Sequence, residues 1–368
     1  MGTYYQKNKL LTLEITTTTL CNFACDYCFE NGTPIKEVNL VEKRLDEIIL
    51  TIDKLLKDSW FKENFDKLVI SFWGGEPTLK INVIEKIFNY FKDDPRVSYY
   101  IYSNGSNINK LMAILNICNQ GQFEVQISYD GRLLQDLRRK TKSGKGTADL
   151  VLDGIDQLYV NKCDFALKAT ITWKDFNYLP DMWDDYKNLR DKMGDKIKLS
   201  LTVDYHNIQF KKYRRVVEEN LILVAKKEIK FYRENGMFLS NIFSGKKGIC
   251  SAGKNFFIVD NLGKVFTCHG AIYSSDISPL CEIFDYDFIS KIKNKSRNFK
   301  ENENLPKECE NCVAVTCLRC NVKKFENSKK DKFFERWNDY LSQPELCNYY
   351  KLTGRIGRAL SSILREEK

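Results

Sequence analysis

Histidine is scarce in this sequence. The 368 residues contain only His206 and His269, against thirteen cysteines, so zinc sites built from paired cysteines and histidines cannot be numerous. No run approaches the ~20 apolar residues that a membrane span needs, and the amino-terminal residues lack the apolar segment of a signal peptide. These absences predict a cytoplasmic protein.

The thirteen cysteines therefore need another explanation. Disulfide frameworks belong to small secreted domains, and this chain is long and carries no secretion signal. Closely spaced cysteines in a cytosolic enzyme indicate metal binding, as zinc or as iron–sulfur. The length suits one large α/β domain with a smaller module.

The net charge is +9, and basic residues concentrate in 291–300 and 323–334. This charge permits an acidic peptide or nucleic acid as a partner, although a solvated lysine-rich surface is the preferred explanation. No interleaved aromatic pattern favours nucleic acid, so we expect none.

From residue 11 to about residue 205, β-type runs alternate with helical ones. The helical segments are 41–56, 83–91, 112–118 and 150–160. The expected strands are 11–17, 67–73, 97–103, 123–129, 164–172 and 196–203. Six βα repeats predict an α/β fold with a parallel sheet and right-handed crossovers, a partial (β/α)6 TIM-like barrel. Catalytic groups of such barrels lie at the carboxyl ends of the strands.

Beyond the barrel, residues 211–245 are expected to form a helical connection. After residue 245 the pattern changes to short strands, turns and many cysteines. We therefore expect a core domain at 1–245, a cysteine-rich domain at 246–350 and a docking helix at 351–368. The last has four apolar residues on one helical face: Ile356, Leu360, Ile363 and Leu364.

Cys21, Cys25 and Cys28 follow the first expected strand with the spacing C-x3-C-x2-C. Three thiolates on one loop can hold three irons of a cubane 4Fe–4S cluster and leave the fourth iron open. The alternative is three core cysteines that are close by chance. The spacing and position resemble the signature of the radical SAM superfamily, in which S-adenosylmethionine (SAM) binds the open iron.

The next two strands end in polar turns. Gly74, Gly75 and Glu76 follow the second strand, and Ser103 and Asn104 follow the third. A Gly-Gly-Glu turn alone is weak evidence, but behind the cysteine loop it resembles the superfamily motif for the amino group of SAM. The turn at 103–105 is similar to the polar turn of the family.

The fourth strand ends at Ser128, and Arg138 and Arg139 follow shortly. The resemblance implies that Ser128 and one of the two arginines, with Arg139 preferred, bind the SAM carboxylate. Tyr27 fits the aromatic residue that lies against adenine in this family.

Eight further cysteines follow residue 249, and seven of them, all except Cys281, form a spaced set. In isolation they would also suit a zinc ribbon, but behind a radical SAM core their order resembles the SPASM domain, which holds two auxiliary 4Fe–4S clusters. The resemblance implies three 4Fe–4S clusters in all. It assigns Cys309, Cys312, Cys317 and Cys347 to the outer auxiliary cluster and Cys250, Cys268 and Cys320 to the inner one.

The cysteine module departs from the family in two ways. In its centre the spacing is C-x2-C-x4-C-x2-C, and each of the last two gaps is one residue shorter than in the usual pattern. In addition, Phe256 stands where sulfatase maturases have an eighth cysteine. The inner cluster would then have an open iron or a ligand other than cysteine. Three remaining cysteines are assigned to packing: Cys118, Cys163 and Cys281.

His269 directly follows Cys268. Anaerobic sulfatase maturases have an aspartate there as catalytic base, and a histidine could also move a proton near neutral pH. Hydrogen bonding to a cluster sulfur, or lining the pocket, is the alternative role.

The resemblance implies an enzyme that cleaves SAM to a 5′-deoxyadenosyl radical and modifies a ribosomally made precursor peptide. We expect an oxidative cross-link (a cyclophane carbon–carbon bond, a thioether or an ether). A flavodoxin or ferredoxin would supply electrons. Because the chain starts near the first strand, leader recognition would fall to a separate protein or to a basic surface. Alternatives are a maturase forming formylglycine, a small-molecule radical dehydrogenase, and a non-enzymatic iron–sulfur or zinc protein.

Overall fold

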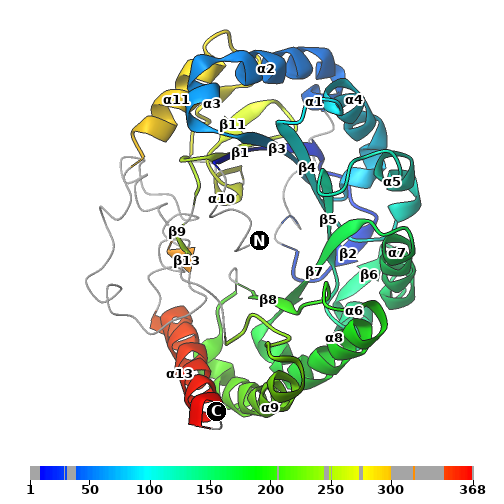
Figure 1. Cartoon of the computed structure of the whole chain (residues 1–368), viewed down its shortest axis with the longest axis vertical. Helices are drawn as coiled ribbons and strands as arrows, with labels where there is room; N and C mark the ends of the chain where they lie inside the picture. Colours follow the sequence, from blue (N-terminus) through cyan, green and yellow to red (C-terminus); the bar gives the residue numbers. More distant parts are fainter. Residues whose placement is uncertain are drawn as a thin grey trace.

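The computed structural model describes residues 9–28, 30, 39–204, 207–243, 248–249, 251–272, 277–299, 318–319 and 344–366. Nine strands of this part of the chain form one sheet in the order β12-β11-β10-β1-β3-β4-β5-β7-β8. Figure 1 shows the strands curving around the centre of the molecule with helices outside them. The strands of this sheet are β1 (Leu10–Thr18), β3 (Lys67–Gly74), β4 (Val97–Ser103), β5 (Phe123–Ser128), β7 (Asp164–Ile171), β8 (Ser200–Val203), β10 (Phe256–Val259), β11 (Lys264–Phe266) and β12 (Cys281–Glu282).

The six predicted strands are confirmed as the parallel run from β1 to β8. Their outward residues are apolar, as Leu11, Leu13 and Ile15 of β1 show in the main core. The alternate residues of the same strand, including Thr12, Glu14 and Thr16, are also buried and lie on the opposite face. Such alternation is required in a barrel sheet, because helices cover its outer face and its inner face lines the interior of the barrel.

The sheet does not stop at the expected domain boundary. β10 pairs in parallel with the free edge of β1, with Leu13 opposite Phe257, and β11 and β12 then add antiparallel strands. Residues 256–282 therefore extend the barrel sheet itself. Two small sheets complete the strands, one from β2 (Phe23–Cys25) and β6 (Arg139–Thr141), the other from β9 (Gly248–Ile249) and β13 (Leu318–Arg319).

Amphipathic helices cover the outer face of the sheet. In α2 the apolar residues recur at helical spacing, and six of them are buried: Leu45, Ile48, Ile49, Ile52, Leu55 and Leu56. The helices are α1 (Leu40–Lys43), α2 (Leu45–Lys57), α3 (Ser59–Asn64), α4 (Ile81–Phe91), α5 (Ile108–Leu115), α6 (Arg132–Arg138), α7 (Ala148–Val160), α8 (Leu179–Met193), α9 (Phe210–Asn235), α10 (His269–Ile272), α11 (Phe288–Arg297) and α13 (Pro344–Glu366), with 3-10 turns η1 (Pro77–Lys80) and η2 (Trp173–Tyr178).

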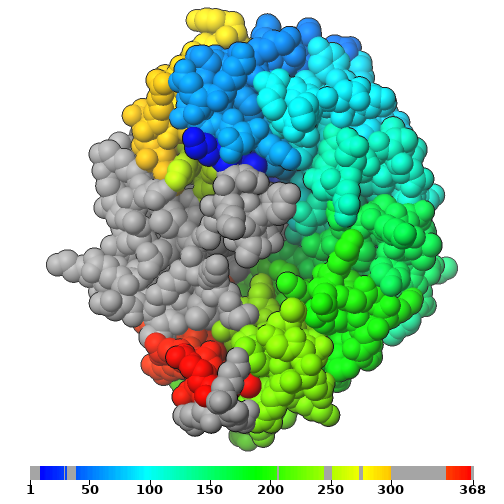
Figure 2. Space-filling view, viewed as in Figure 1, coloured from blue at the N-terminus to red at the C-terminus, as the bar shows by residue number. Residues whose placement is uncertain are grey.

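Two expected helices have different limits in the structure. The connecting helix α9 ends at Asn235, where Gly236 adopts a left-handed conformation that stops it. The carboxyl-terminal helix α13 begins at Pro344, so it includes Cys347. Figure 2 shows α13 (red) beside α9 (yellow-green). The ring of Tyr349 packs against Trp173, with ring centres 5.2 Å apart. None of the helices in the described ranges is long and apolar enough to cross a membrane.

Gly154 of α7 allows this helix to lie against the turn after β4. A Cβ at Gly154 would stand 2.3 Å from the carbonyl oxygen of Gly105. Gly154→Ala should therefore destabilise the protein by about 1–3 kcal/mol through overpacking, although glycine-to-alanine changes inside helices normally stabilise. Urea denaturation measures the difference. The exposed neighbour change Asp153→Ala should leave the midpoint nearly unchanged, and a stabilised Gly154→Ala variant would contradict this account.

Candidate active site

The three cysteines of the amino-terminal loop line one cavity of about 310 Å³ at the carboxyl ends of the strands. Cys21 follows β1, Cys25 ends β2, and Cys28 follows a turn in which its backbone N–H donates to the Cys25 carbonyl at 3.2 Å. The backbone N–H of Phe23 lies 3.4 Å from the sulfur of Cys21 and donates to it. A donor aimed at this sulfur favours its thiolate form.

The thiols fit an iron–sulfur cluster. Burial raises the pKa of Cys21, and it raises that of Cys25 to about 12, with smaller contributions from nearby negative groups that include the other cysteines. A bound cationic iron reverses this balance, because thiolates are the ligating form. Among the described residues no three His, Cys, Asp or Glu side chains converge on one ion. A cubane does not require such convergence, because each cysteine binds a different iron.

The Gly-Gly turn holds the cysteine loop in place. Gly74 has φ +140°, and a Cβ there would stand 2.0 Å from the carbonyl oxygen of Thr18. A Cβ at Gly75 would stand 2.4 Å from the carbonyl oxygen of Leu20. The N–H groups of Gly75 and Glu76 donate to these same two carbonyls, at 3.0 and 2.8 Å. Only glycine permits so close an approach of β3 to the loop.

Glu76 is fully buried, and its carboxylate organises the neighbouring turns. It accepts hydrogen bonds from the N–H and hydroxyl of Thr78 at 3.1 and 2.6 Å. It also accepts from the hydroxyl of Ser103 at 3.0 Å and from the N–H of Asn104 at 2.7 Å. Burial raises the pKa of Glu76, and these donors oppose the rise. Gly74, Gly75, Ser103 and Asn104 line the cavity, and the glutamate lies behind them.

Asn104 connects Glu76 to the cysteine loop. Its side-chain amide donates to Oδ1 of Asn22 at 2.8 Å and to the sulfur of Cys21 at 3.9 Å. Asn22 in turn donates to the hydroxyl of Ser106 at 2.8 Å. The sequence analysis did not assign Asn22. The signal available to it was a polar amide directly after the first cysteine.

Ser128 and Arg139 both line the cavity. Arg139 is buried and pairs with the fully buried Asp130, its Nε 2.8 Å from Oδ2. The hydroxyl of Tyr27 also donates to Asp130, and the guanidinium carbon of Arg139 lies 5.2 Å from the centre of the Tyr27 ring. Burial, followed by the charge of Asp130, raises the pKa of Tyr27, which favours its role as a donor. Asp130 is a further residue that the sequence analysis passed over.

Arg138 belongs to a different network. It pairs with Asp26 at 2.6 Å and with Asp175, and it is absent from the residues that line the 310 Å³ cavity. The β2–β6 pairing explains the difference. Arg139 stands opposite Cys25 in that ladder, whereas Arg138 ends α6.

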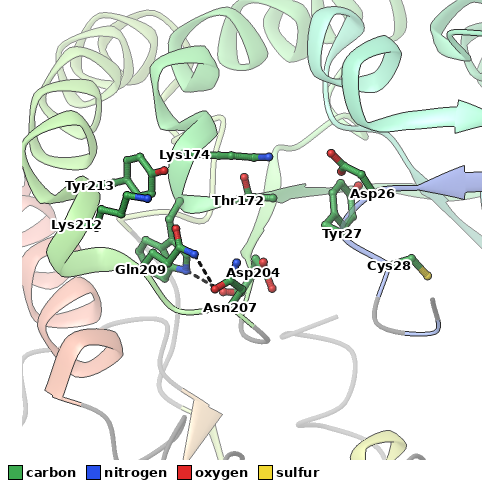
Figure 3. A pocket seen from close by; sticks show the side chains of 11 residues that line it. Asp26, Tyr27, Cys28, Thr172, Lys174, Asp204, Asn207, Gln209, Lys212 and Tyr213 are labelled. Atoms are coloured by element: carbon green, nitrogen blue, oxygen red, sulfur yellow. Dashed lines mark hydrogen bonds between the residues drawn. The ribbon is translucent and has the colours of Figure 1, made fainter. Parts of the chain in front are cut away.

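A second cavity of about 460 Å³ lies on the other side of Tyr27. Figure 3 shows Asp26, Tyr27 and Cys28 facing Gln209, Lys212 and Tyr213 of the α9 segment across it. Gln209 donates to Asn207 at 2.8 Å on its floor. Tyr27, Cys28 and Asp204 line both cavities, so the cysteine loop borders two adjoining spaces.

His269 begins α10, and its ring packs against Trp73 with centres 4.3 Å apart. Its Nε2 is hydrogen-bonded to Oε1 of Glu14, and Ser71 donates to the other oxygen of that carboxylate at 2.8 Å. Trp73 lines the cavity, so His269 contacts the wall of the cavity. The sequence analysis did not predict a role for Glu14. The signal that could have indicated one is a carboxylate in the middle of an otherwise apolar strand.

The carboxyl-terminal cysteines are only partly described. Cys268 and Cys347 are partly buried. Cys250, Cys309, Cys312, Cys317 and Cys320 lie outside the described residues. The three cysteines assigned to packing all belong to the main core or its edge: Cys118, Cys163 and Cys281.

The fold and the cysteine-lined cavity define an α/β barrel with a candidate cofactor site at the carboxyl ends of its strands. Residues 15–172 match the family model described as Radical SAM superfamily. This part of the chain is therefore a radical SAM domain, for which the family implies SAM and one 4Fe–4S cluster.

Two curated relatives illustrate the similarity. An uncharacterized protein of Methanocaldococcus jannaschii is 30% identical over 47% of this chain and 56% of its own length, so the match spans little more than half of that protein. The radical SAM cyclopropyl synthase TigE of Paramaledivibacter caminithermalis is 23% identical over 87% of this chain and 70% of its own.

Among solved structures, native anSMEcpe with bound AdoMet and Cp18Cys peptide matches with a TM-score of 0.68. The identity is 18%, and the match covers 98% of this chain and all of that one. At this identity the match establishes the fold, which agrees with the predicted TIM-like barrel.

The role of Glu76 can be tested by a neutral change. Glu76→Gln replaces one of the two accepting carboxylate oxygens by an NH2 group, which cannot accept a hydrogen bond. At least one buried donor around Glu76 is then left without an acceptor. The apoprotein should lose about 1–3 kcal/mol of stability and take up less iron on reconstitution. Urea denaturation and iron analysis measure both. Glu63→Gln, on the exposed surface, should change neither. A Glu76→Gln variant with normal stability would contradict the proposed organising role.

Proposed function

We propose that this enzyme cross-links residues of a ribosomally made precursor peptide. The observation that carries the proposal is the combination of a cysteine-lined cavity in a radical SAM domain with the set of seven cysteines from Cys250 to Cys347 that excludes Cys281. The likeness over most of the chain to TigE, a radical SAM cyclopropyl synthase, supports a reaction that forms a ring. The fold shared with anSMEcpe, which was solved with a peptide, supports a peptide substrate.

Cys21, Cys25 and Cys28 would hold the cluster whose open iron binds SAM. When bound together, the cluster and SAM supply a 5′-deoxyadenosyl radical that removes hydrogen from carbon. Gly74, Gly75, Ser103 and Asn104 would orient the amino end of SAM, with Glu76 fixing their turns. Tyr27, held by Asp130, would lie against adenine at the border of the two cavities.

The inner wall of the barrel would position the peptide. Trp73 and Tyr102 meet edge to face with centres 4.8 Å apart and line the cavity beside Gln126. Such a wall accepts an apolar or aromatic side chain and excludes water from the reacting carbon. His269, oriented by Glu14, would accept the proton released by the substrate.

The seven carboxyl-terminal cysteines would hold two auxiliary clusters, with the assignment given by the sequence. Anaerobically reconstituted protein should then contain about twelve irons per chain, the content of three cubanes. Replacing Cys21, Cys25 and Cys28 by alanine should lower this to about eight and abolish 5′-deoxyadenosine formation. Cys118→Ala should preserve the full content. A wild-type value of about four irons would refute the auxiliary clusters while leaving the radical SAM site intact.

A formylglycine-forming maturase is the second candidate, favoured by the anSMEcpe fold, and in it His269 would have to replace the aspartate base as the residue after Cys268. Co-expression with a candidate precursor peptide, followed by tandem mass spectrometry, separates the two. We expect a product that has lost two hydrogens per link and gives no fragments between the linked residues. Oxidation of one Cys or Ser to formylglycine without a link would identify the maturase instead.

A further inference from the structure

Gln126 presents an unused hydrogen-bond donor to the interior of the barrel. In β5 the apolar residues Val125 and Ile127 belong to the main core, so Gln126 between them lies on the inner face. It is 8% exposed and lines the 310 Å³ cavity together with the three cysteines. Among the described residues its amide nitrogen has no hydrogen-bond partner. A donor buried in this way is unfavourable until an acceptor arrives.

Tyr100 fixes the orientation of the Gln126 amide. The buried hydroxyl of Tyr100 donates to Oε1 of Gln126 at 3.0 Å. Tyr100 is absent from the residues that line the cavity, whereas Gln126 lines it. The oxygen of the amide is therefore held toward Tyr100, and the NH2 group is the part of the amide that is left for the cavity.

Aromatic rings stand beside this donor. Tyr102 is the register partner of Gln126 on the adjacent strand β4, and its ring meets Trp73 edge to face with centres 4.8 Å apart. Both rings line the cavity. On the other side of Gln126 the register partner in β7 is Ala166, which adds only a methyl group. Three neighbouring strands thus place two rings and one donor at the same level of the barrel.

The base beneath these rings is apolar. Tyr102 packs against a small cluster that is separate from the main core: Leu10, Val69 and Tyr100. A side chain that enters from the carboxyl ends of the strands would meet the two rings, this apolar base and the amide donor. A planar ring suits the aromatic walls, and an oxygen at the far end of the ring suits the donor. Tyrosine supplies both.

We propose that this pocket binds a tyrosine side chain of the peptide, with its ring against Trp73 and Tyr102 and its phenolic oxygen accepting a hydrogen bond from Gln126. This inference rests on the peptide substrate proposed above and names one of its residues. Gln126 would determine specificity, because a phenylalanine in the same place leaves the buried donor without an acceptor. Tyr100 would be a positioning residue, since it holds the amide in the productive orientation.

The test compares N-acetyl-tyrosinamide with N-acetyl-phenylalaninamide, which differ only in the phenolic oxygen. Binding is measured by anaerobic equilibrium dialysis with reconstituted, oxidised enzyme and SAM, so that no turnover occurs. Wild type should bind the tyrosine amide about tenfold more tightly. Gln126→Met has a similar size but lacks the donor, so it should bind both amides with similar affinity. Tyr100→Phe frees the amide to rotate and should lose part of the preference, which gives a second reading if Gln126→Met folds poorly.

Gln157→Met is the matched control, because Gln157 is exposed on α7 and the chemical change is the same. It should keep the wild-type preference. A Gln126→Met enzyme that retains the full preference for the tyrosine amide would overturn the inference. So would wild-type protein that binds the two amides equally or binds neither. The cross-link itself is tested separately, by mass spectrometry of a co-expressed peptide, so a failure of the tyrosine pocket and a failure of the proposed function are distinguishable.

Discussion

The cysteine loop depends on the backbone contact between the end of β1 and the Gly-Gly turn of β3. The carbonyls of Thr18 and Leu20 receive the N–H groups of Gly75 and Glu76, and no side chain fits between the two segments. The buried carboxylate of Glu76 accepts a hydrogen bond from the backbone of Asn104 in the turn after β4. The side chain of Asn104 in turn donates to Asn22, beside Cys21. One carboxylate thus connects three strand ends to the first cysteine.

Electrostatic pairing divides the charged residues of the site into two kinds. Arg139 with Asp130, Arg138 with Asp26, and His269 with Glu14 are paired inside the protein and hold their neighbours in position. Lys168 is a charged residue of the cavity without such a pair among the described residues. Paired groups shape a site, whereas an unpaired one is available to a ligand.

Continuity of the sheet places the carboxyl-terminal region close to the radical SAM domain. β10 pairs directly with β1, and the following segment carries Cys268 and His269 to the strand that carries Glu14. The contact between His269 and Trp73 then brings this region to the cavity wall. The two parts of the chain therefore share one sheet, which brings residues distant in sequence to one cavity wall.

The sequence by itself determined the parallel barrel, its six strands and the cysteine loop, because alternating apolar residues and fixed cysteine spacing are local properties. It also predicted which strand ends carry polar groups. Only the tertiary structure decided which charges are cancelled. Glu14 and His269 meet although they are 255 residues apart, and Asp130 and Arg139 meet from the two ends of α6. Lys168 reads as one lysine in an apolar strand until the pairing of β5 with β7 sets it beside Ser128.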